Sequence, residues 1–457
     1  MTGHTKSHAS FISECSIETI PVDVRNRALT MIKDGSAALL AAANPRYSTG
    51  HTIAEHVRSL GGEPQAGVVG HGFRTNAVQA ALANGTMGYA CDIEPHHPEA
   101  ILHPIAVMIP TALALCELSG GSGDDFITAI ILGCEVEYRV SMAIGPAEQY
   151  ALGFHPSAVC GTFGATAAAA SILNLDPETT ERALGLAGCE ASGLMAWESD
   201  PTENARPFQM GLAARNGVTA ALLARDGFGG PAEIFDRAHS PLNAFSRNPT
   251  AERLTHQIGE TWDGLMELAI KPYPCVAFLH PGLDALLELV DENDISADDV
   301  ETLTIRFPKS GIHCIEDNPL KSHSAPYVLP VTLARRQLEI DDLFFDARND
   351  DPKIAELCKK VEVVADEAEL ESLFPDFYAT EIVVRLADGR TLSRRKDIAR
   401  GYPETPMGQS NLADKFEKLL GSVDNDRVTP LYQAIDNLPG AKNIETFAAL
   451  MTKSVET

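Results

Sequence analysis

The sequence predicts a predominantly α fold, in which a large helical domain is joined to a smaller α+β domain. Across roughly the first 260 residues Ala is abundant, and apolar residues recur at the three- and four-residue spacing of helices. After Pro272 the pattern changes, because alternating β-branched segments typical of strands appear. The length of 457 residues also exceeds what one hydrophobic core usually serves. We therefore expect a discontinuous helical domain, 1–268 with 404–457, and an α+β domain, 269–403.

Start and stop signals bound most of the helices expected in the first part of the chain. Asn44-Pro45 and Gly145-Pro146 each end a helix, since Gly and Pro disfavour its continuation. Asp124 lies near the start of a helix, where the dipole favours an acidic residue. Asp176-Pro177 starts another, with Pro at an early helical position. The expected helices are 24–43, 74–89, 104–118, 124–144, 157–173, one that begins at 176, and 211–225.

The second part of the chain combines strand and helix patterns. Residues 300–307 (VETLTIRF) alternate and are β-branched, which indicates a strand, and 361–365 form a second candidate. Two further strand segments, 380–386 and 391–395, flank Ala387-Asp388-Gly389, a sequence that favours a hairpin turn. The expected helices here are 281–291 and 326–336, followed by 412–420 and 427–438, which should return to the first domain.

The formal net charge of −27 makes the chain strongly acidic. Such a surface favours solubility and argues against nucleic-acid binding, which needs clustered Lys and Arg. The negative electrostatic field of the whole protein would repel an anionic substrate. A site for such a substrate should therefore be locally cationic.

The cysteines and the apolar segments indicate a cytoplasmic protein. Nine cysteines are scattered without CxxC pairs or zinc spacing, as is typical of reduced thiols. Residues 1–16 are polar and lack the apolar core of a signal peptide. The chain offers no run of roughly 18 or more apolar residues that would predict a membrane span. We therefore expect no contact with membranes.

The densest polar segment is 91–104, CDIEPHHPEAILHP, which prolines interrupt. Three interpretations stay open. His96, His97 and His103 could hold a metal ion with a carboxylate, although their spacing matches no familiar motif. The segment could be a solvated loop. It could also be an acid–base loop that binds carboxylates, which we favour because histidine titrates near neutrality and can carry a proton.

A second segment, Gly153-Phe154-His155-Pro156-Ser157, precedes a helix rich in small residues. Pro156 suits the first helical turn, so His155 should lie near a helix N-terminus, where anions are stabilised. A lone histidine is nevertheless more often structural than catalytic. Gly161 and Gly164 follow, and because no strand precedes them, helix packing is a better interpretation than a dinucleotide-binding loop.

A third segment contains Arg206 before Pro207, which predicts extended backbone just before a helix. Its guanidinium could grip a carboxylate through two hydrogen bonds. The alternative is an ion pair with Glu203 or Glu198.

The fourth segment, 271–281, reads KPYPCVAFLHP and lies where the helical pattern gives way to the α+β pattern. Domain junctions favour small-molecule pockets. Two prolines restrict the backbone around Lys271, which could bind an anion or act as a base if burial lowers its pKa. Cys275 lies near His280, but no Asn or Asp partner is evident, so covalent catalysis is not expected.

In this order the four segments resemble the MmgE/PrpD family, and the resemblance covers nearly the whole chain. The family pattern has an Asp-rich loop ending in His-Pro, then Gly-aromatic-His, then Lys-Pro-Phe-His before Gly-x-Ala-Ala, then Lys-Pro-Tyr-Pro-Cys with a following His. A later Ser-x-Pro-Tyr is matched by 324–327. The resemblance implies a large all-helical domain plus a smaller α+β lid domain, with the active site between them. It also implies no cofactor and a homodimer.

The resemblance also assigns site residues. The family's site residues fall on Asp92, His103, His155 and Lys271, which we expect to be catalytic, with Tyr327 as a further match. The residues expected to bind substrate are Arg206, His96, His97, Tyr327 and Tyr138, and Tyr138 is also a candidate for a second acid–base group.

Three positions depart from the family pattern. The lysine of the third segment is Arg206, the second Asp of the loop is Glu94, and Val276 stands where an arginine often follows. An arginine in effect only holds charge, whereas a lysine can exchange a proton. Lys271 is therefore the remaining lysine candidate for proton transfer.

These departures bear on the choice among the family's reactions, which share proton removal or return next to a carboxylate. They favour epimerisation of a small amino-polycarboxylate such as iminodisuccinate. Dehydration of 2-methylcitrate or a related hydroxy-tricarboxylate is the first alternative, and cis-aconitate-type decarboxylation is the second. A carboxylate-binding protein without catalysis is the non-enzyme alternative. In each case the expected partner is a small anionic polycarboxylate.

Overall fold

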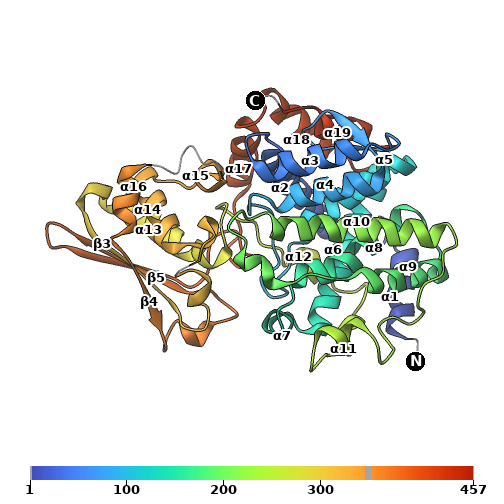
Figure 1. Ribbon diagram of the computed structural model, residues 1–457, viewed down its shortest axis with the longest axis horizontal. Helices are drawn as coiled ribbons and strands as arrows, with labels where there is room; N and C mark the ends of the chain where they lie inside the picture. Colours follow the sequence, from blue (N-terminus) through green and yellow to red (C-terminus); the bar gives the residue numbers. More distant parts are fainter. Residues whose placement is uncertain (1–2, 317, 345–350, 456–457) are drawn as a thin grey trace.

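The computed structural model describes residues 3–316, 318–344 and 351–455. A large helical body and a smaller α+β body lie side by side along the longest axis (Figure 1). The predicted fold class, predominantly α with a smaller α+β unit, is confirmed. Within the described residues, no helix combines the length and apolar character that crossing a membrane requires.

The centre of the helical body is a group of closely packed helices: α4 (Ala77–Tyr89), α5 (Pro104–Ser119), α6 (Gly123–Ile144), α8 (Pro156–Ile172) and α10 (Ala205–Arg225). The buried faces of α4, α8 and α10 are rich in Ala and Gly, which lets the backbones approach closely. A Cβ atom on Gly164 would lie 2.7 Å from the carbonyl oxygen of Gly133 on α6. The helix-packing interpretation of Gly164 is therefore confirmed.

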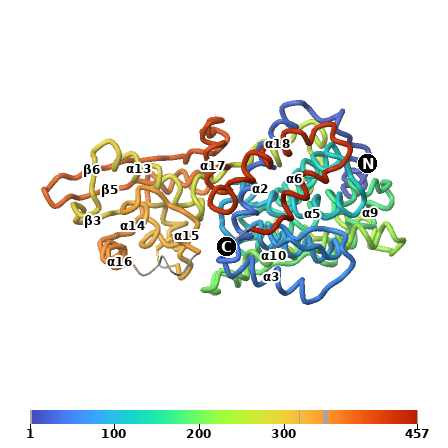
Figure 2. The backbone as a smooth tube through the Cα atoms, turned by 90° about the horizontal axis from the view of Figure 1, so that it is seen from above, coloured from blue at the N-terminus to red at the C-terminus, as the bar shows by residue number. Residues whose placement is uncertain are grey.

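Further helices surround this centre, and the C-terminal ones lie against the N-terminal ones. Phe416, Leu431 and Phe447 share one hydrophobic core with residues of the first helices. Figure 2 shows the C-terminal α17 and α18 beside α2. The outer helices are α1 (His4–Glu14), α2 (Val22–Ala42), α3 (Ser48–Leu60), α7 (Pro146–Ala151), α9 (Pro177–Glu190), α11 (Pro241–Phe245), α12 (Asp263–Met266), α17 (Gln409–Gly421), α18 (Val428–Asp436) and α19 (Glu445–Thr452).

The α+β body is built on a four-stranded sheet with the order β4-β3-β5-β6. Strand β3 (Val300–Pro308) is parallel to β4 (Val361–Asp366) and antiparallel to β5 (Thr380–Leu386), which pairs with β6 (Thr391–Lys396). These are the four strands that the alternating segments predict. The helices of this body are α13 (His280–Asn293), α14 (Ala325–Arg335), α15 (Ile340–Phe344) and α16 (Pro352–Cys358), and it has a hydrophobic core of its own.

Two local predictions are wrong. The helix expected from residue 74 begins at Ala77, because Phe73–Thr75 is strand β2, which pairs with β1 (Ala66–Val68). The side chain of Asn76 accepts a hydrogen bond of 2.9 Å from the Gln79 amide and so caps α4.

Arg206 is helical rather than extended, since α10 already begins at Ala205. Pro207 is tolerated there because the amide groups of a first helical turn have no acceptor within the helix. The preference of the residue before a proline for extended backbone is therefore overridden.

The chain crosses between the two bodies at two adjacent places. The amide of Ile270 donates a 2.8 Å hydrogen bond to the carbonyl of Gly401, which joins the two crossings. Gly401 has φ +94°, and a Cβ atom there would collide with the carbonyl oxygen of Ile270. Beside them, the backbone of His96 pairs with that of Ala269. The polar loop is thereby attached to the connection between the bodies.

Candidate active site

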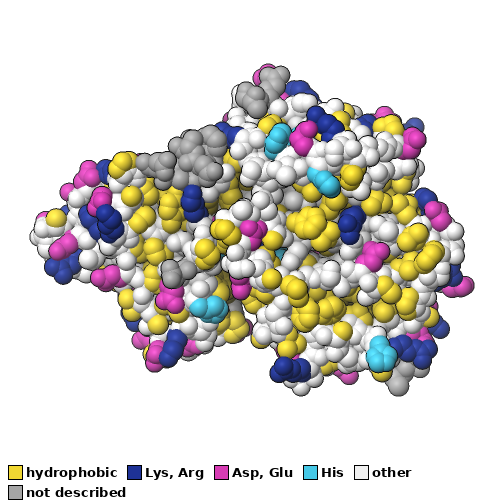
Figure 3. Space-filling view, viewed as in Figure 1, with side chains coloured by type: hydrophobic (Ala, Val, Ile, Leu, Met, Phe, Trp, Pro, Cys, Tyr) yellow, Lys and Arg dark blue, Asp and Glu magenta, His cyan; other side chains and the backbone are white. Residues whose placement is uncertain are grey.

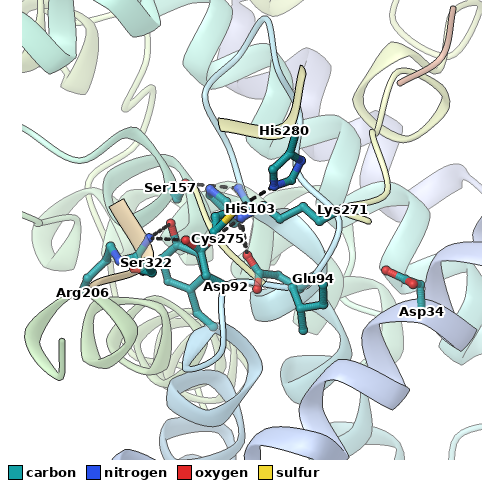
Figure 4. A network of polar contacts seen from close by, with 12 residues as sticks. Asp34, Asp92, Glu94, His103, Ser157, Arg206, Lys271, Cys275, His280 and Ser322 are labelled. Carbon is teal, nitrogen blue, oxygen red and sulfur yellow. Dashed lines mark hydrogen bonds and ion pairs between the residues drawn. The ribbon is translucent and has the colours of Figure 1, made fainter. Parts of the chain in front are cut away.

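Segments far apart in the chain bring five charged or titratable side chains together where the two bodies meet (Figure 4). They are Asp92 and Glu94 from the loop after α4, His103 at the N-cap of α5, Arg206 in the first turn of α10, and Lys271 at the crossing. Asp92 adopts left-handed backbone, with φ +51°, a conformation that Asp tolerates better than most residues. We call these five residues the central cluster.

Asp92 bridges the two cations of the central cluster. Its Oδ1 accepts a hydrogen bond from Lys271 Nζ, and its Oδ2 lies 3.3 Å from Nη1 of Arg206. Asp92 and Lys271 are each 1% exposed, so water screens this contact little. Burial opposes the charge of Asp92, but Arg206 and Lys271 outweigh it and hold the pKa of the carboxyl well below its usual range. Asp92 is therefore a fixed negative charge between two positive ones.

Glu94 differs from Asp92 because burial dominates. Its Oε1 lies 2.6 Å from Nδ1 of His103 and 3.6 Å from Nζ of Lys271, while its Oε2 has no hydrogen-bond partner among the described residues. Burial raises the pKa of Glu94 to about 7, with Asp92 adding to the rise and Lys271 opposing it. Burial, together with Lys271, holds the pKa of His103 well below its usual value. At neutral pH the Glu94–His103 pair therefore holds a proton that it can give or take.

Three further histidines surround the central cluster and are neutral. His155 is the N-cap of α8, as predicted, and its Nδ1 lies 2.8 Å from Oε1 of Gln209. Burial lowers the pKa of His155 to about 3, although Gln209 opposes the shift. His323, from the α+β body, also has its pKa lowered to about 3, by burial and by Arg206. His96 stacks on His103 with ring centroids 6.0 Å apart, and neither of its ring nitrogens has a partner among the described residues.

Arg206 is held by aromatic rings as well as by carboxylates. Its guanidinium carbon lies 4.7 Å from the centroid of the Tyr89 ring and 5.4 Å from that of Trp197. Its Nη2 is 3.7 Å from Oε2 of Glu203. Burial opposes its charge, but Asp92 outweighs burial and raises the pKa of Arg206 above its already high value. The ion pair with Glu203, the alternative in the sequence analysis, is therefore present, and Arg206 also contacts Asp92 within the central cluster.

Three of the residues expected to bind substrate are not brought to the central cluster. Nε2 of His97 lies 3.3 Å from the Asp263 carbonyl, and its Nδ1 accepts from the Ala100 amide at 3.2 Å. The His97 ring stacks on Tyr138, with centroids 4.8 Å apart. The hydroxyl of Tyr327 donates to the Asp342 carbonyl at 2.9 Å. These contacts hold local backbone in place. We therefore propose no substrate contact for His97, Tyr138 or Tyr327.

The metal interpretation of the polar loop also fails on geometry. Because the backbone engages both ring nitrogens of His97, this side chain cannot join His96 and His103 around one ion. Across the three described stretches of the chain, no group of three or more His, Cys, Asp or Glu is arranged to hold a metal.

The sequence interpretation missed several members of the site. In the sequence, Glu94 stands out as a departure from the family pattern, and nothing there marks it as a proton carrier. His323 lies beside Ser324, in the segment that drew attention to Tyr327 instead. Tyr89 and Trp197 carry no motif, and only the packing of α4, α10 and the segment before α10 reveals them.

Cys275 and His280 lie close to the central cluster without forming a nucleophilic pair. His280 Nε2 is 3.1 Å from the backbone carbonyl of Cys275, not from its thiol. Burial raises the pKa of the Cys275 thiol well above its usual value, so a thiolate is disfavoured. The expectation that covalent catalysis is absent therefore has a physical basis.

The surface cavities lie away from this chemistry. One of about 520 Å³ lies between α5 and α19, and another of about 700 Å³ lies beside Tyr273 on the α+β body. Neither is lined by a residue of the central cluster. The view in Figure 3 shows a constriction between the two bodies. Asp92, Glu94, Arg206 and Lys271 are buried, whereas His103 is partly exposed.

Two family comparisons together cover most of the chain. Residues 6–254 match the MmgE/PrpD N-terminal domain, and residues 273–433 match the MmgE/PrpD C-terminal domain.

Curated relatives are similar over nearly their full lengths. A cis-aconitate decarboxylase-like protein oryM of Aspergillus oryzae is 28% identical, with 98% of this chain and 97% of the relative aligned. The cis-aconitate decarboxylase of Aspergillus terreus is 27% identical, with 100% and 97% aligned. The cis-aconitate decarboxylase of Mus musculus is 26% identical, with 98% and 93% aligned.

Proposed function

The chain belongs to the MmgE/PrpD family, and on that premise we propose that it is a cofactor-independent lyase that decarboxylates a small cis-aconitate-like polycarboxylic acid. The observation that carries the proposal is the contact of the buried Glu94 carboxyl with the partly exposed His103, beside the cations Lys271 and Arg206. The full-length similarity to two cis-aconitate decarboxylases and to a cis-aconitate decarboxylase-like protein supports the reaction. It shifts our preference from the epimerase that the sequence departures favour.

The two cations suit a substrate with several carboxylates. Arg206 keeps its charge at any working pH, and its Nε, which has no partner among the described residues, is left to donate to a substrate carboxylate. Lys271 lies beside Glu94 and can stabilise negative charge that develops during the reaction. Because Asp92 contacts both cations, it fixes their spacing before substrate arrives. Such prior positioning removes the cost of reorganising the site during the reaction.

The proton held by Glu94 and His103 completes the reaction. When carbon dioxide leaves, the bond between its carbon and the substrate breaks and leaves an electron pair on the substrate. In an unsaturated acid this pair can form a new double bond while the former double bond takes up a proton. A carboxyl group with a pKa near 7 is close to half protonated at neutral pH, so it can deliver that proton and be reloaded from solvent.

Epimerisation of an amino-polycarboxylate such as iminodisuccinate is the second candidate, and one observation favours it. His103 and His155 come from different elements, and both pack near Tyr89, with ring centroids 4.4 Å and 6.3 Å from it. Two separate proton carriers are what removal and return of a proton on opposite faces would require.

Proton NMR in deuterated water distinguishes these reactions. The protein is incubated separately with cis-aconitate, 2-methylcitrate and iminodisuccinate. Decarboxylation of cis-aconitate should release carbon dioxide and leave one deuterium on carbon in the product. Deuterium uptake without loss of carbon dioxide would support epimerisation, and a new alkene from 2-methylcitrate would support dehydration. If the folded protein changes none of the three, the proposal of a polycarboxylate enzyme fails.

A further inference from the structure

Trp197 brings an unused hydrogen-bond donor to the site. It lies in the short 3-10 segment Met195–Ser199 and is 6% exposed. Its Nε1 is buried and has no hydrogen-bond partner among the described residues. A buried indole N–H normally finds an acceptor, and leaving one unsatisfied is unfavourable. The position of this donor therefore needs an explanation.

Three groups of the site lie around the Trp197 ring, and one of them, Arg206, also faces the carboxylates of Asp92 and Glu203. The indole ring lies 5.4 Å from the guanidinium carbon of Arg206. Its ring centroid is 5.7 Å from that of His155 and 6.1 Å from that of His323. An indole N–H can only donate, so its partner must be an acceptor. Beside a fixed positive charge and two neutral imidazoles, an anionic acceptor is the chemistry that fits.

The segment that carries Trp197 is held on both sides. The His155 amide donates to the Gly193 carbonyl at 3.1 Å, and the Met195 amide donates to the Gly153 carbonyl at 2.9 Å. Nε2 of Gln209 donates to the Leu194 carbonyl at 2.8 Å. These bonds attach the segment to the residues that position His155. The indole is therefore placed by the same contacts that place a predicted site residue.

Trp197 also packs across the junction between the two bodies. It forms a small hydrophobic cluster with Met195 and with Leu320 of the α+β body. The indole ring is therefore held by side chains of both bodies.

We propose that Trp197 Nε1 donates a hydrogen bond to the substrate carboxylate that Arg206 binds, so that Trp197 is a specificity-determining residue. The inference rests on the proposed polycarboxylate substrate. It assigns that carboxylate two different donors, a charged guanidinium and a neutral indole. An analogue that lacks this carboxylate leaves both donors unpaired, and sites built to hydrogen-bond a substrate group reject such analogues strongly.

The chain has two tryptophans, which allows a direct test. Trp262 is buried in the core of the helical body and lies 5.8 Å from Phe11, ring centroid to centroid. The variant Trp262→Phe leaves Trp197 as the sole tryptophan. This variant is titrated with tricarballylate, a saturated tricarboxylate that cannot undergo the allylic decarboxylation. We expect a saturable change in Trp197 emission.

Calorimetry with tricarballylate supplies the second measurement. Trp197→Phe keeps an aromatic ring and removes the N–H group, so we expect its affinity to fall about tenfold, corresponding to about 1.4 kcal/mol. Trp262→Phe is the matched control and should bind like the unchanged protein. Thermal melts of both variants establish that they are folded. If Trp197→Phe does not fold, the emission titration of Trp262→Phe alone tests the role of Trp197.

The outcomes separate the inference from the proposed function. If the unchanged protein binds tricarballylate, but Trp197 emission stays constant or the folded Trp197→Phe variant binds equally well, the role of Trp197 is wrong and the proposed function stands. If the unchanged protein does not bind tricarballylate, the polycarboxylate proposal and this inference both fall.

Discussion

Oε1 of Glu94 lies 2.6 Å from Nδ1 of His103, and the same oxygen lies 3.6 Å from Nζ of Lys271. The carboxyl is therefore placed between a group that can share its proton and a group that opposes its protonation. Burial decides the balance and raises the pKa of Glu94 to about 7. Asp92, only two residues earlier, is held fully charged by Arg206 and Lys271. Two neighbouring acids of one loop thus have different roles, one as a fixed charge and one as a proton carrier.

The pH dependence of stability tests the state of Glu94. Because its pKa is higher in the folded protein than the usual 4.5, the folded state holds the proton more tightly than the unfolded chain. The free energy of unfolding should therefore fall as pH rises from about 4.5 to about 7. Glu94→Gln removes this contribution, so the variant should gain stability relative to the unchanged protein across that range. Urea unfolding at several pH values measures the difference.

Glu135 has a similarly raised pKa. It is present both in the unchanged protein and in Glu94→Gln, so its effect on the free energy of unfolding cancels when these two are compared. A difference between the two proteins that stays constant from pH 4.5 to pH 7 would contradict a raised pKa at Glu94.

Lys271→Met should lower turnover by at least about a hundredfold, the low end of general acid–base contributions. Asp92 keeps its contact with Arg206 in this variant, so the protein should still fold. Steady-state kinetics with the substrate identified by NMR gives the effect, and circular dichroism checks the fold. Lys309→Met, on the surface of the α+β body, is the matched control. Near-normal turnover of Lys271→Met would remove Lys271 from the mechanism.

Binding of a polycarboxylate should take up protons. Burial raises the pKa of Glu94 to about 7, and a bound anion raises it further by disfavouring the charged carboxylate. Calorimetric titration with tricarballylate at pH 7, in two buffers with different ionisation enthalpies, counts the protons. We expect net uptake, reduced in Glu94→Gln. Equal binding enthalpies in both buffers would mean that Glu94 does not respond to the ligand.

Lys415 should position the loop that carries Asp92 and Glu94, because it contacts this loop from α17. Its Nζ, on α17, lies 2.7 Å from Oδ1 of Asp34 and donates to the Ile93 carbonyl at 3.0 Å, directly before Glu94. The double variant Asp34→Asn with Lys415→Met removes this support without leaving a buried charge. We expect lower turnover and a displaced pH profile, because the charge of Lys415 also acts on Glu94.

Asp34→Asn alone keeps the bond from Lys415 to Ile93 and serves as the control for the double variant. A double variant that loses stability but keeps its pH profile would limit Lys415 to a structural role.

Gly401→Ala should destabilise the connection between the bodies. The residue has φ +94°, and the added Cβ would meet the Ile270 carbonyl, so we expect a loss of about 1–3 kcal/mol in the free energy of unfolding. Gly408→Ala is the control, because that position has ordinary φ and no atom within 4 Å of the added Cβ. Similar denaturation midpoints for the two variants would show that the close approach at Gly401 is unimportant.

The sequence predicted the parts of this protein whose signal is local. Helical periodicity, the alternation of residues 300–307 and the Pro after His155 each act through neighbouring residues, and the structure has the expected elements there. Strands β1 and β2 were missed because three residues are too few to show alternation.

The members of the site that were misjudged depend on tertiary contacts. His96 and His97 are adjacent, yet only His96 faces the central cluster, because the backbone contacts of His97 with Asp263 and Ala100 turn its ring toward Tyr138. His323 joins the site from a position more than two hundred residues after His103. The spacing of residues along the chain shows neither the orientation of the His97 ring nor the approach of His323 to the site.

The paired crossings at Ile270 and Gly401 limit how the two bodies can move relative to each other. A hydrogen bond between the two crossings holds these chain segments side by side. Lys271 follows Ile270 directly, so the same hydrogen bond restrains the backbone from which Lys271 reaches Asp92. One cation of the site is thus anchored at the place where the two bodies are connected.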